Sequence, residues 1–120
     1  IGILESVRPM TETIAEQCGV RRKLVSIRMV DMPVLEVLHE GARLEAALLT
    51  QSRLAIDTDH ADAIVLGCTG MFGMAERLAV ALGGDIPVID PILAAVSEAA
   101  QLVRLGLSHS KRSSPRPTRL

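Results

Sequence analysis

One cysteine of this chain lies between two glycines, in a pattern that could do acid–base chemistry. Cys68 follows the apolar run 63–66 and Gly67, and Thr69 and Gly70 come directly after it. A thiol of ordinary pKa, about 8.5, is shifted towards neutrality by the amino end of a helix, which makes it a usable general base or nucleophile. The glycines let the backbone turn sharply, so its N–H groups and the Thr69 hydroxyl could hold a carboxylate or an enolate-like oxygen. A buried, inert cysteine in a strand-to-helix turn is the other interpretation, and spacing alone leaves both open.

Two further polar residues each follow a predicted strand, as Cys68 does. Asp90 precedes Pro91 at the expected start of a helix, so it is either an N-cap or a side chain that faces the same strand-end cleft as Cys68. Ser6 has the same pair of interpretations, a turn residue or a ligand donor at the carboxyl edge of the sheet. We therefore take Ser6, Thr69, Gly70 and Asp90 as candidate substrate-binding residues.

The remaining cysteine and the histidines carry weaker signals. Cys18 lies near the end of an amphipathic helix, beside a glycine cap, and there a structural role is favoured. His60, between Asp59 and Asp62, could be a base, but a surface loop histidine is favoured. His39 and His109 have no acidic or cysteine partner at metal-ligand spacing. The sequence therefore predicts no metal site.

Strands and helices alternate along the chain in the order that would position these residues. Apolar runs predict strands at residues 1–4, 24–30, 63–66 and 86–89, and helical spacing predicts helices at 9–18, 41–59, 72–82 and 91–105, with a short helical turn at 34–38. This order predicts an α/β fold with a three-layer parallel sheet flanked by helices. Residues 1–107 would form one α/β lobe, and residues 108–120 a polar, exposed tail.

Composition narrows the functional classes. The 120 residues are 48% hydrophobic and 22% charged, which is typical of a globular domain. A single phenylalanine, no tryptophan or tyrosine, and a net charge of -1 argue against nucleic-acid binding and against attraction to a membrane surface. No apolar run could span a bilayer, and the two cysteines imply no disulfide framework, so we expect a reduced, cytoplasmic setting. The chain starts at Ile1 inside a strand pattern, which suggests a piece of a larger fold.

Three strings together resemble a known family. They are Val-Leu-Gly-Cys-Thr-Gly-Met at 65–71, Ile-Pro-Val-Ile-Asp-Pro at 86–91 and Leu-Gly-Leu-Ser-His-Ser-Lys at 105–111, and residues 31–35 add to them. Over nearly the whole chain they resemble the C-terminal half of the aspartate/glutamate/hydantoin racemase superfamily, closest to its hydantoin and allantoin racemase branch. The resemblance implies one lobe of a two-lobed racemase fold, with an active site between the lobes.

The resemblance also implies a mechanism. Each lobe supplies one cysteine, and without a cofactor one thiolate removes the α-proton of an amino-acid derivative such as a hydantoin, while the other thiol returns a proton to the opposite face. Cys68 matches the second-lobe cysteine, Thr69 and Gly70 match the turn that cradles the anionic end of the substrate, and Ser6 is a looser match. The first lobe is absent and Cys18 does not match its cysteine in context, so the chain is expected to be an incomplete racemase.

Other functions stay open on the sequence alone. Within enzymes they are an aspartate or glutamate racemase, or a maleate isomerase whose cysteine attacks the substrate covalently. From another class comes a non-catalytic α/β module that binds a small anion or a partner chain. An exposed sheet edge also makes a homo-oligomer possible.

Overall fold

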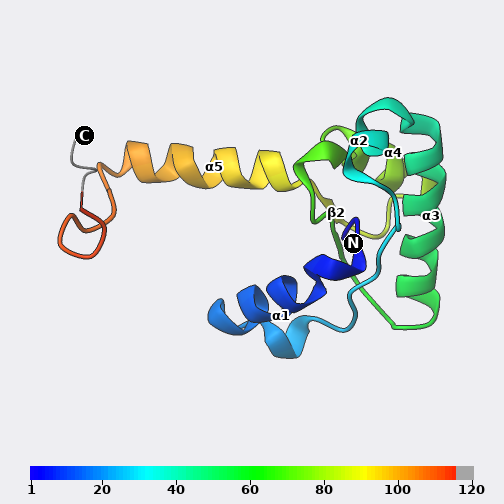
Figure 1. Ribbon diagram of the computed structural model, residues 1–120, viewed down its shortest axis with the longest axis horizontal. Coiled ribbons are helices and arrows are strands. Elements are labelled where there is room, and N and C mark those ends of the chain that lie inside the picture. Colours follow the sequence, from blue (N-terminus) through cyan, green and yellow to red (C-terminus); the bar gives the residue numbers. More distant parts are fainter. Residues whose placement is uncertain (116–120) are drawn as a thin grey trace.

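Two parallel strands lie at the centre of the computed structural model, which describes residues 1–115 (Figure 1). Strand β1 (Ile64–Val65) pairs with β2 (Val88–Ile89), so that Ile64 is opposite Val88 and Val65 is opposite Ile89. The crossover between them contains a 3-10 turn, η3 (Thr69–Met71), and helix α4 (Met74–Ala81). Both strands lie inside the predicted runs 63–66 and 86–89 but are shorter, two residues each.

The predicted strands 1–4 and 24–30 are wrong as regular strands. Gly2 and Met29 form a single isolated parallel bridge between these segments. Pairing stops there because Asp31 has a φ of 51°, outside the extended region, and its N–H turns to the Ile3 carbonyl at 2.8 Å. In residues 1–115 the sheet therefore has two strands and this bridge beside them, and the expected three-layer parallel sheet is not confirmed.

The amino-terminal segment nevertheless lies directly along β1. The terminal amino group of Ile1 donates a hydrogen bond to the Val65 carbonyl, and the Gly67 N–H donates to the Ile1 carbonyl at 2.8 Å. Ile1 thus bonds to the residues on either side of Leu66, which is the hydrogen-bond pattern of two parallel strands. The extended segments thus lie side by side, with residue 29 next to residue 2, residue 1 next to β1, and β1 next to β2.

Helices follow the predicted order with small changes at their ends. The first of them, α1, is preceded by the 3-10 turn η1 (Glu5–Val7), and a second turn, η2 (Arg21–Lys23), follows it. The α-helices are α1 (Arg8–Gln17), α2 (Val34–His39), α3 (Gly41–Asp57), α4 and α5 (Pro91–Arg104). Helix α4 begins at Met74 and not at the predicted Phe72, because Gly73 between them adopts the left-handed region with a φ of 77°.

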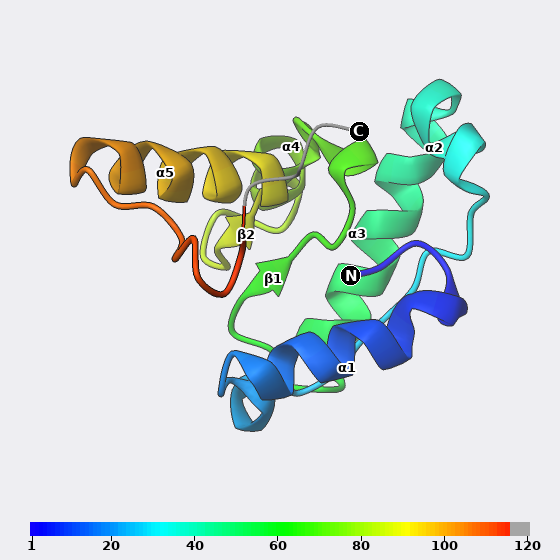
Figure 2. The same cartoon turned by 60° about the vertical axis from the view of Figure 1, so that its left-hand side comes forward.

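The core lies between one face of the sheet and helices α3 and α4 (Figures 1 and 2). Leu44 and Leu48 of α3, Leu66 after β1 and Met71 of η3 are completely buried, and Leu78 of α4 is 1% exposed. Burying an aliphatic side chain of this size contributes about 1.5–3 kcal/mol, so this aliphatic cluster is the main support of the fold.

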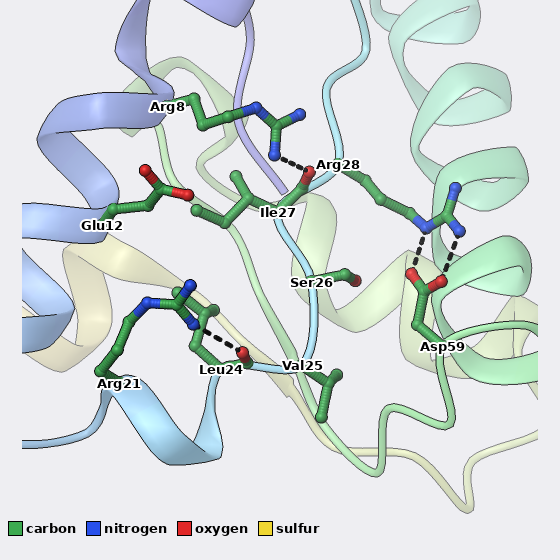
Figure 3. A pocket seen from close by; sticks show the side chains of 9 residues that line it. All are labelled: Arg8, Glu12, Arg21, Leu24, Val25, Ser26, Ile27, Arg28 and Asp59. Atoms are coloured by element: carbon green, nitrogen blue, oxygen red, sulfur yellow. Dashed lines mark hydrogen bonds and ion pairs between the residues drawn. The ribbon is translucent and has the colours of Figure 1, made fainter.

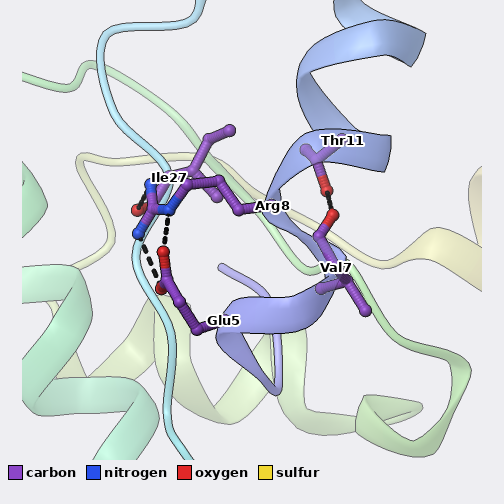
Figure 4. Close-up of polar contacts among 5 residues, drawn as sticks. All are labelled: Glu5, Val7, Arg8, Thr11 and Ile27. Atoms are coloured by element: carbon purple, nitrogen blue, oxygen red, sulfur yellow. Dashed lines mark hydrogen bonds and ion pairs between the residues drawn. The ribbon is translucent and has the colours of Figure 1, made fainter.

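The opposite face of the sheet is only partly covered. Because side chains alternate along a strand, Val65 and Ile89 point away from the core, and they are 58% and 41% exposed. Helix α1 lies on this side and is anchored by Arg8, whose guanidinium donates to the Ile27 carbonyl at 2.8 Å and pairs with Glu5 (Figure 4).

Helix α5 extends from the end of β2 away from the rest of the molecule (Figures 1 and 2). None of its residues is buried. Residues 108–115 after it are exposed, and the last part of the predicted tail, 116–120, lies outside the described residues. In the part of the chain that the structure describes, every helix is too short or too polar to cross a membrane.

Candidate active site

Cys68 lies just past the carboxyl end of β1 and caps the turn η3. Its backbone is extended, with a φ of -142° and a ψ of 137°, and its side chain is partly buried. The Gly70 N–H donates a hydrogen bond to the Cys68 sulfur at 3.4 Å. An N–H directed at sulfur stabilises negative charge on it. The expected α-helix amino terminus is not at Cys68, because α4 starts at Met74.

Gly70 is held against the short helix α2. A Cβ at this position would lie 3.0 Å from Val37 Cγ1 and 3.6 Å from the Cys68 sulfur, so no larger side chain fits without movement. Val37 itself is 3% exposed. Helix α2 therefore fixes the turn that carries the thiol. The sequence analysis missed this role, although the apolar residues at 34–38 were the signal for it.

Gly67, on the other side of Cys68, makes a second close approach. A Cβ there would lie 3.1 Å from the Ile1 carbonyl oxygen and 3.6 Å from the Gly2 Cα. Both neighbours are backbone atoms, which cannot rotate away as a side chain can. The two glycines around Cys68 are thus required by packing, and the cysteine is held between the amino-terminal segment and α2.

Asp90 is an N-cap, the structural interpretation of the two that the sequence allowed. One carboxylate oxygen accepts from the N–H groups of Ile92 at 2.8 Å and Leu93 at 3.1 Å, and the other accepts from the Gly73 N–H at 3.1 Å. Burial raises the pKa of Asp90, but these three N–H groups outweigh it and hold that pKa below its usual 3.8. Asp90 thereby joins the end of the Cys68 loop to the start of α5, a link through Gly73 that the sequence analysis missed.

Thr69 and Ser6 are exposed and are not among the residues that line the cleft described below. Thr69 is the first residue of η3 and Ser6 is in η1. Of the predicted site residues, the structure brings Cys68 and Gly70 into contact and leaves Thr69, Ser6 and Asp90 without a contact to the sulfur among the described bonds. Within residues 1–115, no three His, Cys, Asp or Glu side chains gather as metal ligands.

Cys68 borders a cleft of about 470 Å³ on the open side of the sheet. One wall is α1 and the other is the sheet with its amino-terminal neighbour. The lining is mostly aliphatic and includes Ile1, Val7, Met10, Ile14, Val65 and Gly67. Cys18 also lines this cleft, but it follows the ten-residue helix α1, which is about 15 Å long, so it belongs to the end of the cleft away from Cys68.

A second, polar cleft of about 330 Å³ lies between α1 and residues 24–28 (Figure 3). Arg28 crosses its edge and makes a two-pronged ion pair with Asp59, with Nε 2.6 Å and a terminal nitrogen 2.8 Å from the two carboxylate oxygens. The hydrogen bond from Arg28 holds the pKa of Asp59 below its usual value. Because the guanidinium and carboxylate satisfy each other, this pair fastens residues 24–28 to the end of α3.

Comparison with known proteins finds a matching family model and several relatives. A family model described as Asp/Glu/hydantoin racemase matches residues 1–99. A hydantoin racemase of Rhizobium meliloti is 39% identical over 103 residues, covering 86% of this chain and 42% of that protein. A hydantoin racemase of Paenarthrobacter aurescens is 38% identical over 115 residues, covering 95% of this chain and 48% of that protein.

Solved structures of two allantoin racemases are also similar to this chain. Allantoin racemase from Pseudomonas fluorescens superposes with a TM-score of 0.85 and 37% identity, over 99% of this chain and 51% of that one. Allantoin racemase from Klebsiella pneumoniae gives a TM-score of 0.86 and 30% identity, over 99% and 49%. The chain thus spans about half the length of the proteins that it matches.

Proposed function

Because the chain belongs to the Asp/Glu/hydantoin racemase family, we propose that it carries one half of a cofactor-independent racemase site in which Cys68 is the acid/base. The substrate class is an amino-acid derivative such as a hydantoin, a choice supported by the names of the relatives. The observation that carries the proposal is the Cys68 turn itself. It places a thiol at the carboxyl end of a parallel strand, where α/β sheets bind ligands, with a backbone N–H directed at the sulfur.

The reaction that this half-site supports is proton exchange at a carbon next to a carbonyl. The Cys68 thiolate takes the α-proton, so the C–H bond breaks, an S–H bond forms, and the electron pair moves onto the carbonyl oxygen as an enolate. N–H and hydroxyl groups around Thr69 and Gly70 stabilise that oxygen, and Ser6 helps to bind the substrate from the neighbouring loop. Asp90 is a positioning residue, because its carboxylate accepts a hydrogen bond from Gly73 and so holds the loop that follows the cysteine.

Inversion of the α-carbon needs a second acid on the opposite face of the substrate. If Cys68 alone removes and returns the proton, the proton comes back to the face that it left. Cys18 belongs to the far end of the cleft and does not take this second role. We therefore propose that the chain is one lobe of a two-lobed, three-layer racemase fold, and that the complementary lobe supplies the other thiol.

The test is deuterium exchange with one enantiomer of a 5-substituted hydantoin in deuterated water. Proton NMR follows loss of the α-proton, and optical rotation follows inversion, both corrected for the reaction without protein. We expect the chain to accelerate exchange more than inversion, and Cys68→Ser to return exchange to the uncatalysed rate. Cys18→Ser is the matched control and should keep the activity. Equal exchange by the chain and by Cys68→Ser would refute the assignment.

A further inference from the structure

Two ion pairs fix the walls of the polar cleft shown in Figure 3. Arg28 is matched by Asp59 through two bonds between guanidinium and carboxylate. Arg8 is matched by Glu5 in the same two-pronged way, and its third nitrogen donates to the Ile27 carbonyl at 2.8 Å. Both guanidinium groups are thus occupied by bonds within the protein, so these pairs are structural parts of the cleft.

The end of this cleft at α1 carries an excess of negative charge. Glu12 is half-buried there and lines the cleft, and it makes no hydrogen bond or ion pair within residues 1–115. The hydrogen bond with Glu5 is the main cause that raises the pKa of Arg8, and the negative charge of Glu12 adds to it. Two carboxylates therefore share one guanidinium, and Glu12 is the one that it does not bond.

The other end of the cleft is positive. Arg21 lines it and belongs to the turn η2, in which all three residues are basic. Among the described residues its side chain makes one long hydrogen bond, of 3.5 Å, to the Leu24 carbonyl. Figure 3 shows Glu12 reaching into the cleft from α1 and Arg21 reaching into it from η2. The cleft thus presents one unmatched carboxylate and one weakly bonded guanidinium.

Between these charges the floor of the cleft is aliphatic. Leu24, Val25 and Ile27 line it, and Val25 is 58% exposed. The cleft has a volume of about 330 Å³, at the lower end of the range for ligand pockets, so its ligand must be small. A small molecule with a cation, an anion and an apolar group would match all three parts.

We propose that this cleft binds a free α-amino acid with an apolar side chain. Its ammonium group lies against Glu12, its carboxylate accepts hydrogen bonds from Arg21, and its side chain covers Val25. An amine or a fatty acid supplies only one of the two charges, whereas an α-amino acid carries both on one carbon. Glu12 and Arg21 do not line the cleft at Cys68, so this inference does not depend on the proposed activity.

Leucine and two analogues test the site on the full chain. Isocaproate lacks the ammonium group of leucine, and isoamylamine lacks its carboxylate. Titrations followed by proton–nitrogen NMR correlation spectra give the dissociation constants and show which backbone amides shift. We expect saturable shifts with leucine in residues 8–12 and 21–28. Each analogue should bind about fivefold more weakly than leucine, which corresponds to the ~1 kcal/mol of a partly exposed ion pair.

Charge-removing variants assign each contact. Glu12→Gln should weaken binding of leucine and isoamylamine about fivefold and leave isocaproate unchanged, and Arg21→Gln should weaken leucine and isocaproate and leave isoamylamine unchanged. Glu16→Gln and Arg22→Gln are the matched controls, because they remove the same charges from α1 and η2 outside the cleft. Neither control should change a dissociation constant, and Cys68→Ser should leave leucine binding unchanged.

Three results would overturn the proposal. One is the absence of saturable shifts with leucine, or shifts confined to the loop that carries Cys68. Another is binding of either analogue as tight as that of leucine. The third is a loss of leucine binding in the control variants as large as in Glu12→Gln and Arg21→Gln. Circular dichroism of each variant confirms that the comparison is made between folded chains.

Discussion

Replacing Gly67 by alanine tests whether the cysteine turn is built against the amino-terminal segment. The new Cβ would lie 3.1 Å from the Ile1 carbonyl oxygen, closer than carbon and oxygen normally approach, and in ordinary contact with the Gly2 Cα at 3.6 Å. If the segments stay in place, overpacking of this kind costs about 1–3 kcal/mol. If Ile1 moves away, the hydrogen bonds that Ile1 makes with Val65 and Gly67 are lost, at about 1 kcal/mol each.

Both routes give the same size of effect, so Gly67→Ala should lower the free energy of unfolding by about 1–3 kcal/mol. Urea unfolding followed by circular dichroism measures it. Gly41→Ala is the matched control, since a Cβ there meets only Met74 Cε at 4.0 Å, and this substitution in the first turn of α3 should raise stability by about 0.4–1 kcal/mol. Equal effects of the two substitutions, or a neutral Gly67→Ala, would refute the close approach.

Two further predictions concern the loop that carries Cys68 and is held by Asp90. Because the folded-state pKa of Asp90 lies below its usual 3.8, its stabilising contribution is present above that pH and is lost as the pH falls through the folded value. The stability gap between wild type and Asp90→Asn in urea should therefore narrow below pH 4, and a gap independent of pH would contradict the charged cap. If Cys68 is the acid/base, it should react with iodoacetamide faster than the more exposed Cys18, since the Gly70 N–H is directed at its sulfur; peptide mass spectrometry measures both, and a slower Cys68 would favour a non-catalytic module.

Local signals in the sequence were enough to predict the helices. The spacing of Ile92, Val96 and Val103 after Pro91 predicted α5, which is confirmed, and the N-cap that Asp90 forms is one of the two interpretations that the sequence left open. The long helix 41–59 is confirmed as Gly41–Asp57. These features depend on contacts within a few residues, on side-chain capping and on helical periodicity, which a single sequence displays directly.

The pairing of the strands and the packing around Cys68 could not be predicted in the same way. Residues 24–30 have the alternation of a strand, but their pairing depends on a distant segment, and the left-handed backbone at Asp31 limits it to one bridge. The glycines around Cys68 were interpreted as freeing the backbone. Their larger role is to admit Ile1 on one side and Val37 on the other, contacts that join residues far apart in the chain. Such long-range packing leaves no periodic signal.

Stability and chemistry are connected through β1. Val65 points to the open side of the sheet and Cys68, three residues later, stands at the end of the cleft that begins there. Val65 is 58% exposed, and burying the rest of this side chain would contribute about 1 kcal/mol. A chain that covers this face of the sheet would therefore stabilise the fold. In the proposed two-lobed fold, the chain that covers this face would also lie next to the thiol, since Val65 and Cys68 line one cleft. A complementary half that was selected to cover aliphatic side chains would thus arrive where a second acid is needed, and fold completion and site completion would share one interface.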